Sequence, residues 1–205
     1  MIGFYNYTVI LTYLGLASGV IGILNAFEGR ITIAILCLIF SGFFDMFDGL
    51  VARTKKDRTK QEKTFGIELD SLSDVICFGV LPAAIGYAVG LNKWYFYIIL
   101  VVYVLAALIR LAYFNVSEVE RQEQTTEVRK EYLGLPVTSA ALIIPLIYTF
   151  ILCLKDYFYI LYGITLLVVA FAFLAKFKIK KLKMKGMIAV LIIGLIELII
   201  LLCQR

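Results

Sequence analysis

Long apolar runs alternate with short polar connectors along most of this 205-residue chain. A helix needs about 20 largely apolar residues to cross a bilayer. The pattern predicts seven such membrane helices, over residues 8–28, 31–52, 67–91, 95–116, 134–154, 157–175 and 186–203. We therefore expect an all-α fold, a polytopic helix bundle in the membrane that forms one domain over residues 1–205.

The composition supports a membrane protein and excludes several kinds of site. Hydrophobic residues make up 62% of the chain, whereas soluble domains are close to half apolar. The first residues lack the features of a cleaved secretory signal, so we expect the first apolar run to be retained. The chain has no histidine, which removes the commonest general base. Its four cysteines stand singly, which argues against a disulfide or zinc framework.

Basic residues predict the orientation in the membrane. Lysine and arginine number six, three and six in the polar stretches 52–63, 117–133 and 176–185, against four in the connectors and terminus assigned to the other side. Because basic loops stay in the cytoplasm, we predict a multi-pass protein of the cell membrane with its N-terminus in the cytoplasm. No nucleic-acid-binding motif accompanies the charge, so we expect no nucleic-acid partner.

Two apolar helices carry pairs of carboxylates. Asp45 and Asp48 are three residues apart, and Asp70 and Asp74 are four apart, so each pair projects from one face of its helix. The basic connector between the two helices makes them antiparallel, which brings the pairs to a similar depth. At about 1.5 Å per residue, Asp45 lies roughly 12 Å from Arg53 along the helix axis. The cluster is therefore expected inside the bilayer, near its cytoplasmic rim, with an opening to the cytoplasm.

Four carboxylates in a membrane require compensating charge. Each costs about 2.5 to 3.5 kcal/mol at the centre of a membrane helix, and Arg110 supplies only one positive charge nearby. Divalent cations that take oxygen ligands would neutralise them. We therefore predict a divalent metal site with Mg²⁺ or Mn²⁺, two ions matching four carboxylates. The alternative is that some acids face a water-filled vestibule or hold one structural ion.

Small and basic residues beside the acids indicate the ligand. Gly49 follows Asp48, and Gly66 precedes Asp70 by one helical turn, so a bulky ligand could approach the backbone at both places. Arg53 offers a planar fork suited to phosphate. Together with metals, these residues favour a diphosphate substrate. Neither a Walker loop nor a GxGxxG motif is present to hold phosphate in another way.

The full pattern is Asp45-x2-Asp48-Gly49-x2-Ala52-Arg53, then Gly66-x3-Asp70-x3-Asp74. It resembles the signature of the CDP-alcohol phosphotransferase family, although the connector between the two halves is longer than is common there. Within the family, FGIELDSLSDVICFGVLPA, RLAYFNV and YLGLPVTSAA are similar to segments of the phosphatidylserine synthase branch. This resemblance covers roughly residues 8–154. It implies a homodimeric enzyme with a six-helix core, to which the helix at 186–203 would be an addition, that converts CDP-diacylglycerol and L-serine into phosphatidylserine and CMP.

The resemblance also implies roles by position. Its metal ligands would be Asp45, Asp48, Asp70 and Asp74, and Asp74 would also be the general base. The candidates for nucleotide and diphosphate binding are Gly49, Ala52, Arg53 and Gly66. Arg110 lies in the similar RLAYFNV block and is a candidate for phosphate or serine contact. The polar connector that follows adds Arg121, Arg129 and Lys130 as candidates for the serine site.

Other functions remain open at this stage. The same motif could serve another acceptor alcohol, such as glycerol phosphate or inositol phosphate. An intramembrane prenyltransferase also uses paired aspartates and Mg²⁺, but that class is a poor fit to Gly49, Ala52-Arg53 and Gly66. A cation transporter could have an aspartate-lined passage, yet the chain lacks interrupted helices in matched halves.

Overall fold

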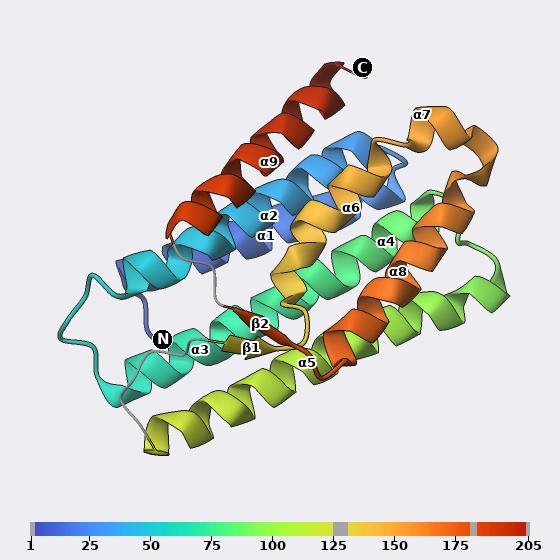
Figure 1. Cartoon of the computed structure of the whole chain (residues 1–205). Helices are drawn as coiled ribbons and strands as arrows, with labels where there is room; N and C mark the ends of the chain where they lie inside the picture. The colour runs from blue at the N-terminus through green and yellow to red at the C-terminus, as the bar shows by residue number, and fades with distance from the viewer. Residues whose placement is uncertain (1–2, 125–130, 181–183, 204–205) are drawn as a thin grey trace.

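The computed structural model describes residues 3–124, 131–180 and 184–203, which form a bundle of long helices (Figure 1). A π-helical turn, Val75–Val80, joins α3 to α4, so the two continue as one rod. The helices are α1 (Ile10–Phe27), α2 (Ile31–Ala52), α3 (Lys60–Asp74), α4 (Leu81–Ala88), α5 (Tyr97–Gln124), α6 (Ala140–Tyr148), α7 (Ile151–Leu154), α8 (Phe158–Leu174) and α9 (Met184–Cys203).

The lengths of these helices confirm a multi-pass membrane protein and correct one of the predicted spans. Within the described residues, five helical stretches are long and apolar enough to cross a bilayer: Tyr7–Phe27, Ile31–Ala52, Lys60–Ala88, Trp94–Glu120 and Ile151–Leu174. The predicted span 134–154 is interrupted: its apolar helical part is Val137–Tyr148, and a turn separates this part from α7. Pro136 limits the start of this helical part, since a residue before proline disfavours helical geometry. Helix α9, Met184–Cys203, covers the predicted span 186–203.

A short antiparallel strand pair was not predicted from the sequence. Strand β1 (Glu131–Leu133) pairs with β2 (Lys178–Lys180), and the pairing links the segment after α5 to the segment after α8. The main-chain nitrogen of Gly134 extends the contact by donating to the carbonyl of Phe177 at 2.7 Å. Strands of three residues leave no clear periodicity in a sequence, so only the proximity of the two segments reveals them.

Small residues bring α1 against α2. A Cβ atom added to Gly22 would lie 2.9 Å from the Cβ of Cys37, so only glycine fits at this contact. Ser18 strengthens the contact by donating from its hydroxyl to the carbonyl of Cys37 at 2.9 Å. Small residues at this interface thus let the two helix backbones approach closely.

The helix that carries Asp70 and Asp74 begins seven residues before the predicted span. Thr59 and Glu62 form a capping box at its start: the main-chain nitrogen of Glu62 donates to the Thr59 hydroxyl at 3.1 Å, and that of Thr59 donates to the Glu62 carboxylate at 2.8 Å. A capping box satisfies main-chain donors that a helix start leaves unpaired. The polar residues from Lys60 onward therefore belong to the helix rather than to a loop.

The π-helical turn directly follows Asp74 and is supported from α5. Pro82 has no N–H group, so it cannot donate to the carbonyl of Phe78 as an ordinary residue four positions later would. The hydroxyl of Tyr103 donates to that carbonyl instead, at 2.9 Å, and both Tyr103 and Phe78 are buried in the core. This contact holds the turn below the aspartates in place.

Candidate functional site

The aspartates predicted from the sequence meet between α2 and α3, which run antiparallel (Figure 1). One carboxylate oxygen from each of Asp45, Asp70 and Asp74 lies within 4.8 Å of the other two. Asp74 is buried, and Asp45 and Asp70 are partly exposed. The structure thus brings carboxylates from both motif-bearing helices into one cluster.

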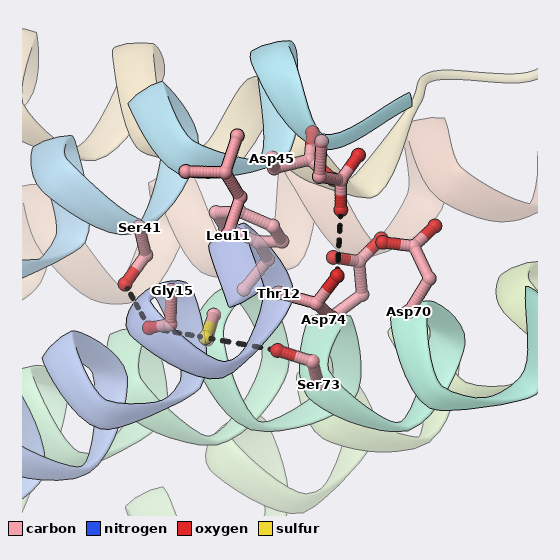
Figure 2. Close-up of a pocket in the computed structure, with 11 residues that line it drawn as sticks. Leu11, Thr12, Gly15, Ser41, Asp45, Asp70, Ser73 and Asp74 are labelled. Atoms are coloured by element: carbon pink, nitrogen blue, oxygen red, sulfur yellow. Dashed lines mark hydrogen bonds between the residues drawn. The ribbon is translucent and has the colours of Figure 1, made fainter. Parts of the chain in front are cut away.

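The closest carboxyl contacts run across the helix interface. Asp45 on α2 is in hydrogen-bonding contact with Asp74 on α3 (Figure 2), and Asp48 on α2 is in contact with Asp70 on α3. Two carboxyl groups this close must share a proton or a cation, because two bare negative charges would repel each other strongly. Because the helices are antiparallel, the first aspartate of α2 faces the last aspartate of α3, and the second faces the first.

A pocket opens beside this cluster, between α1, α2, α3 and the π-helical turn (Figure 2). Thr12 on α1 donates from its hydroxyl to the Asp48 carboxylate at 3.2 Å. Ser41 lies deeper and donates to the carbonyl of Gly15 at 3.0 Å. The residues that line the pocket are Leu11, Thr12, Gly15, Ser41, Asp45, Asp48, Asp70, Ser73, Asp74, Cys77 and Phe78.

The donor set fits a hard divalent cation. Carboxylate oxygens are the ligands that Mg²⁺ and Mn²⁺ prefer, and Asp45, Asp70 and Asp74 supply them from one small volume. Asp48 lies outside this group of three, although it contacts Asp70. The cluster is therefore a candidate metal centre with three facing ligands and a fourth carboxylate at its edge.

The two motif glycines have different surroundings. Among the described residues, a Cβ atom added to Gly49 would meet nothing within 4 Å, so open space lies beside this turn of α2. A Cβ added to Gly66 would lie 2.6 Å from Nη2 of Arg58. Arg53 is exposed at the end of α2, and Ala52 is partly exposed. The small residues thus leave room for an external ligand at Gly49 and for a neighbouring side chain at Gly66.

The connector between α2 and α3 is held by polar contacts that sequence analysis missed. The Lys55 ammonium forms an ion pair with the Glu62 carboxylate at 2.9 Å. This hydrogen bond raises the pKa of Lys55 above its ordinary value. Asn6 donates from its side-chain amide to the same carboxylate oxygen at 3.0 Å. The N-terminal segment and the connector are therefore tied to the first turn of α3.

Arg110 lies on α5, away from the residues that line the pocket. Its side chain is buried, its Nε donates to the carbonyl of Leu135 at 3.3 Å, and its guanidinium carbon lies 5.6 Å from the centre of the Phe114 ring. One turn further along α5, Asn115 accepts a hydrogen bond from the hydroxyl of Ser71 at 3.0 Å. This part of α5 therefore packs behind α3 at the level of the aspartates.

Three basic candidates for the acceptor site receive no support from the structure. Arg121 belongs to α5, but its side chain is not among those described. Arg129 and Lys130 lie outside the described residues. Their predicted roles at a serine site stay predictions.

Several pocket residues went unnoticed in the sequence, although a signal was present. Ser41 precedes Asp45 by four residues and Cys77 follows Asp74 by three, so each shares a helix face with an aspartate. Thr12 is a polar residue within an apolar run, but its partner Asp48 lies 36 positions away. Helical spacing could have identified the first two residues, whereas the third depends on how α1 packs.

Comparison with known proteins gives the same family as the aspartate motif. The family model described as CDP-alcohol phosphatidyltransferase matches residues 5–176. The chain is 39% identical over 107 residues to a CDP-diacylglycerol–serine O-phosphatidyltransferase of Saccharomyces cerevisiae, covering 51% of this chain and 37% of that protein. It is 35% identical over 140 residues to an archaetidylserine synthase of Methanothermobacter thermautotrophicus, covering 68% and 56%.

A bacterial relative adds to this comparison. A CDP-diacylglycerol–serine O-phosphatidyltransferase of Helicobacter pylori is 33% identical over 144 residues, with 69% of this chain and 56% of that protein covered. The chain thus spans between 37% and 56% of the length of these three relatives. The match to the family model ends before α9 begins at Met184.

Proposed function

Because the chain belongs to the CDP-alcohol phosphatidyltransferase family, we propose that it transfers the phosphatidyl group of CDP-diacylglycerol to the hydroxyl of L-serine and releases CMP. The observation that carries this proposal is the carboxylate cluster of Asp45, Asp70 and Asp74 between two membrane helices. The choice of serine is supported by the names of the relatives and by the phosphatidylserine synthase-like segments. We therefore expect CDP-diacylglycerol to enter the site from the membrane and L-serine to enter it from the aqueous phase.

The carboxylates would hold the metal. Asp45, Asp70 and Asp74 are the proposed facing ligands, and Asp48 would join them from the edge of the cluster. We expect two ions, Mg²⁺ or Mn²⁺, for these four groups. When bound, they would offset the negative charge of the diphosphate and of the departing CMP oxygen.

The proposed reaction transfers one proton, forms one bond to phosphorus and breaks another. Asp74 would accept the proton of the serine hydroxyl from its buried position at the pocket wall. The serine oxygen then forms a bond to the phosphorus that carries diacylglycerol, while the bond from that phosphorus to the CMP oxygen breaks. CMP leaves with the electron pair of the broken bond. Proton transfer by a positioned carboxylate contributes typically about 10²- to 10⁴-fold to a rate.

The motif residues at the end of α2 and the start of α3 would bind the nucleotide and diphosphate. Gly49 has open space for a ligand beside it, and the exposed guanidinium of Arg53 can reach a phosphate. Ala52 and Gly66 complete this wall. Arg110 stays a candidate for the acceptor side, because its helix packs behind α3 near the aspartates. The acyl chains could remain in the lipid throughout, since the pocket lies between membrane helices.

Orientation and assembly are part of the proposal. The basic connectors favour a cytoplasmic N-terminus and a pocket that opens to the cytoplasm. A homodimer is expected by analogy with the family. Labelling of single introduced cysteines in intact cells would test the first, and the mass of the purified protein in detergent would test the second.

The decisive experiment measures CMP release by purified protein. CDP-diacylglycerol is supplied with labelled L-serine and Mg²⁺ or Mn²⁺, with and without a chelator, and parallel reactions contain glycerol 3-phosphate or inositol phosphate instead of serine. Transfer of label to lipid only with serine supports the proposal. CMP release only with a phosphorylated acceptor would replace serine, and ion flux in liposomes without CMP release would favour a transporter.

The lipid of the donor can be tested in the same assay. One relative is named an archaetidylserine synthase, so ether-linked and ester-linked CDP-lipids are compared at equal concentration. The pocket residues contact the head group region in our proposal, so we expect both lipids to react.

A further inference from the structure

Arg58 lies in the connector between α2 and α3 and reaches both helices. Its Nη1 donates to the carbonyl of Ala52 at 3.4 Å, and its Nη2 donates to the carbonyl of Glu62 at 3.0 Å. Ala52 is the last residue of α2, and Glu62 belongs to the first turn of α3. One guanidinium group therefore connects the two motif-bearing helices at the end where the connector joins them.

The same guanidinium occupies the space that a side chain at position 66 would need. A Cβ atom there would lie 2.6 Å from Nη2 of Arg58, closer than real Cβ contacts allow. At Gly49, by contrast, an added Cβ meets no atom of the described part of the chain within 4 Å. The two motif glycines are thus required for different reasons: Gly49 leaves open space, and Gly66 leaves room for the guanidinium of Arg58.

The polar groups of Arg58 show a fixed side chain rather than a solvated one. Its two hydrogen bonds within the described part of the chain go to main-chain carbonyls, and its Nε is buried without a partner there. A planar fork with several donors can bridge two carbonyls in a way that a lysine ammonium on a flexible stem cannot. The geometry therefore depends on arginine and not only on positive charge.

We propose that Arg58 is a positioning residue of the nucleotide site and that Gly66 acts by making room for its guanidinium. Arg58 sets the distance from the end of α2, where Ala52 and Arg53 lie, to the start of α3. This inference rests on the proposed function, because it assigns to that wall the nucleotide and diphosphate of the CDP-lipid. It departs from a direct contact between Gly66 and the nucleotide.

A double-mutant cycle tests this inference. The variants Arg58→Ala, Gly66→Ala and their combination are compared with the unchanged protein for the KM of CDP-lipid, kcat, the KM of serine and the midpoint of thermal unfolding. Each single variant is expected to raise the KM for CDP-lipid about tenfold, and the combination no further, because coupled neighbours show non-additive effects. The values of kcat and of the KM for serine should stay near those of the unchanged protein.

Two further variants separate positioning from charge. Arg58→Lys keeps the charge but loses the fork, so its KM for CDP-lipid should match that of Arg58→Ala. Lys56→Ala removes one positive charge from an exposed position in the same connector and should leave the KM unchanged. Should Gly66→Ala alone prevent folding, Arg58→Ala and Arg58→Lys still decide the case, because neither adds a clash.

Additive losses in the combined variant, or an unchanged KM in Arg58→Ala, would overturn the inference. A protein that releases no CMP with any acceptor refutes the proposed function instead. In that case the unfolding midpoints still decide between coupling and independence of Arg58 and Gly66.

Discussion

The carboxyl group of Asp45 on α2 meets that of Asp74 on α3 across the helix interface. The residues are 29 positions apart in the sequence, yet their carboxyl groups are in hydrogen-bonding contact. The site is thus complete only when α2 and α3 pack against each other. Substitutions at the two positions should nevertheless differ, because the proposed chemistry gives only Asp74 the proton.

Replacing Asp74 with Asn should retain binding of CDP-lipid but lower turnover by about 10²-fold or more, because the base is lost. Replacing Asp45 with Asn should lower both turnover and cation-dependent binding. Equilibrium binding of labelled CDP-lipid and single-turnover CMP release measure the two effects separately. Full activity in Asp74→Asn would remove this residue from the role of base.

Chelation of divalent cations should abolish CMP release and lower the thermal midpoint. A ligand that binds only the folded state at 100 times its Kd stabilises it by about 2.7 kcal/mol, and the clustered carboxylates would repel each other once the ligand is removed. Thermal unfolding is measured with EDTA and after adding back Mg²⁺ or Mn²⁺. A combined Asp45→Asn and Asp74→Asn variant is the control, and its midpoint should not respond to the cation. An equal response in that variant would place the cation elsewhere.

Gly49→Ala should separate stability from binding. An added Cβ meets no described neighbour within 4 Å, and alanine is favoured over glycine inside a helix by about 0.5 to 1 kcal/mol, so stability should rise slightly. The KM for CDP-lipid should increase, because the new methyl group takes space proposed for the ligand. Gly194→Ala in α9 is the matched control, since the nearest described atom to its Cβ is Cδ2 of Leu142, at 3.9 Å. An unchanged KM in Gly49→Ala would show that no ligand approaches this turn.

Thr12→Val should weaken cation binding without disturbing the fold. The substitution keeps the shape of the side chain but removes the hydroxyl that donates to Asp48 at 3.2 Å. A hydrogen bond to a charged group contributes about 1.5 to 3 kcal/mol, so the cation concentration needed for half-maximal activity should rise about tenfold. Thr12→Ser keeps the donor and should behave like the unchanged protein. Equal behaviour of the Val and Ser variants would exclude a role for the hydroxyl.

Glu197→Leu should stabilise the protein. The side chain of Glu197 on α9 is 3% exposed, and neither of its carboxyl oxygens has a hydrogen-bond partner within the described part of the chain. A buried polar group without partners costs about 1 to 3 kcal/mol, which an apolar side chain of similar size would recover. Thermal unfolding in detergent measures the change, and Glu197→Gln serves as the control that keeps a polar group. A lower midpoint in Glu197→Leu would indicate that the carboxyl group has a partner in the membrane or in a second copy of the chain.

Local pattern was sufficient for the helical class, for most helix positions and for the four aspartates. Apolar runs of membrane length and carboxylates at helical spacing are properties of neighbouring residues, so they are visible without a fold. The capping box at Thr59 and Glu62 was also present as a pattern, although the predicted helix began later, at residue 67. The predicted span 134–154 was overestimated because hydropathy alone does not register proline and turns.

Contacts between distant segments were decided only by packing. Three contacts each join residues from different helices or from a connector: Asp45 with Asp74, Thr12 with Asp48, and Arg58 with Gly66. Spacing along one helix predicts which side chains share a face, but the partner of that face depends on the rotation and depth at which the next helix packs. Small residues, side-chain volumes and main-chain hydrogen bonds of the whole bundle set that rotation and depth together. The residues that carry the chemistry could therefore be predicted from the sequence, whereas their arrangement in space could not.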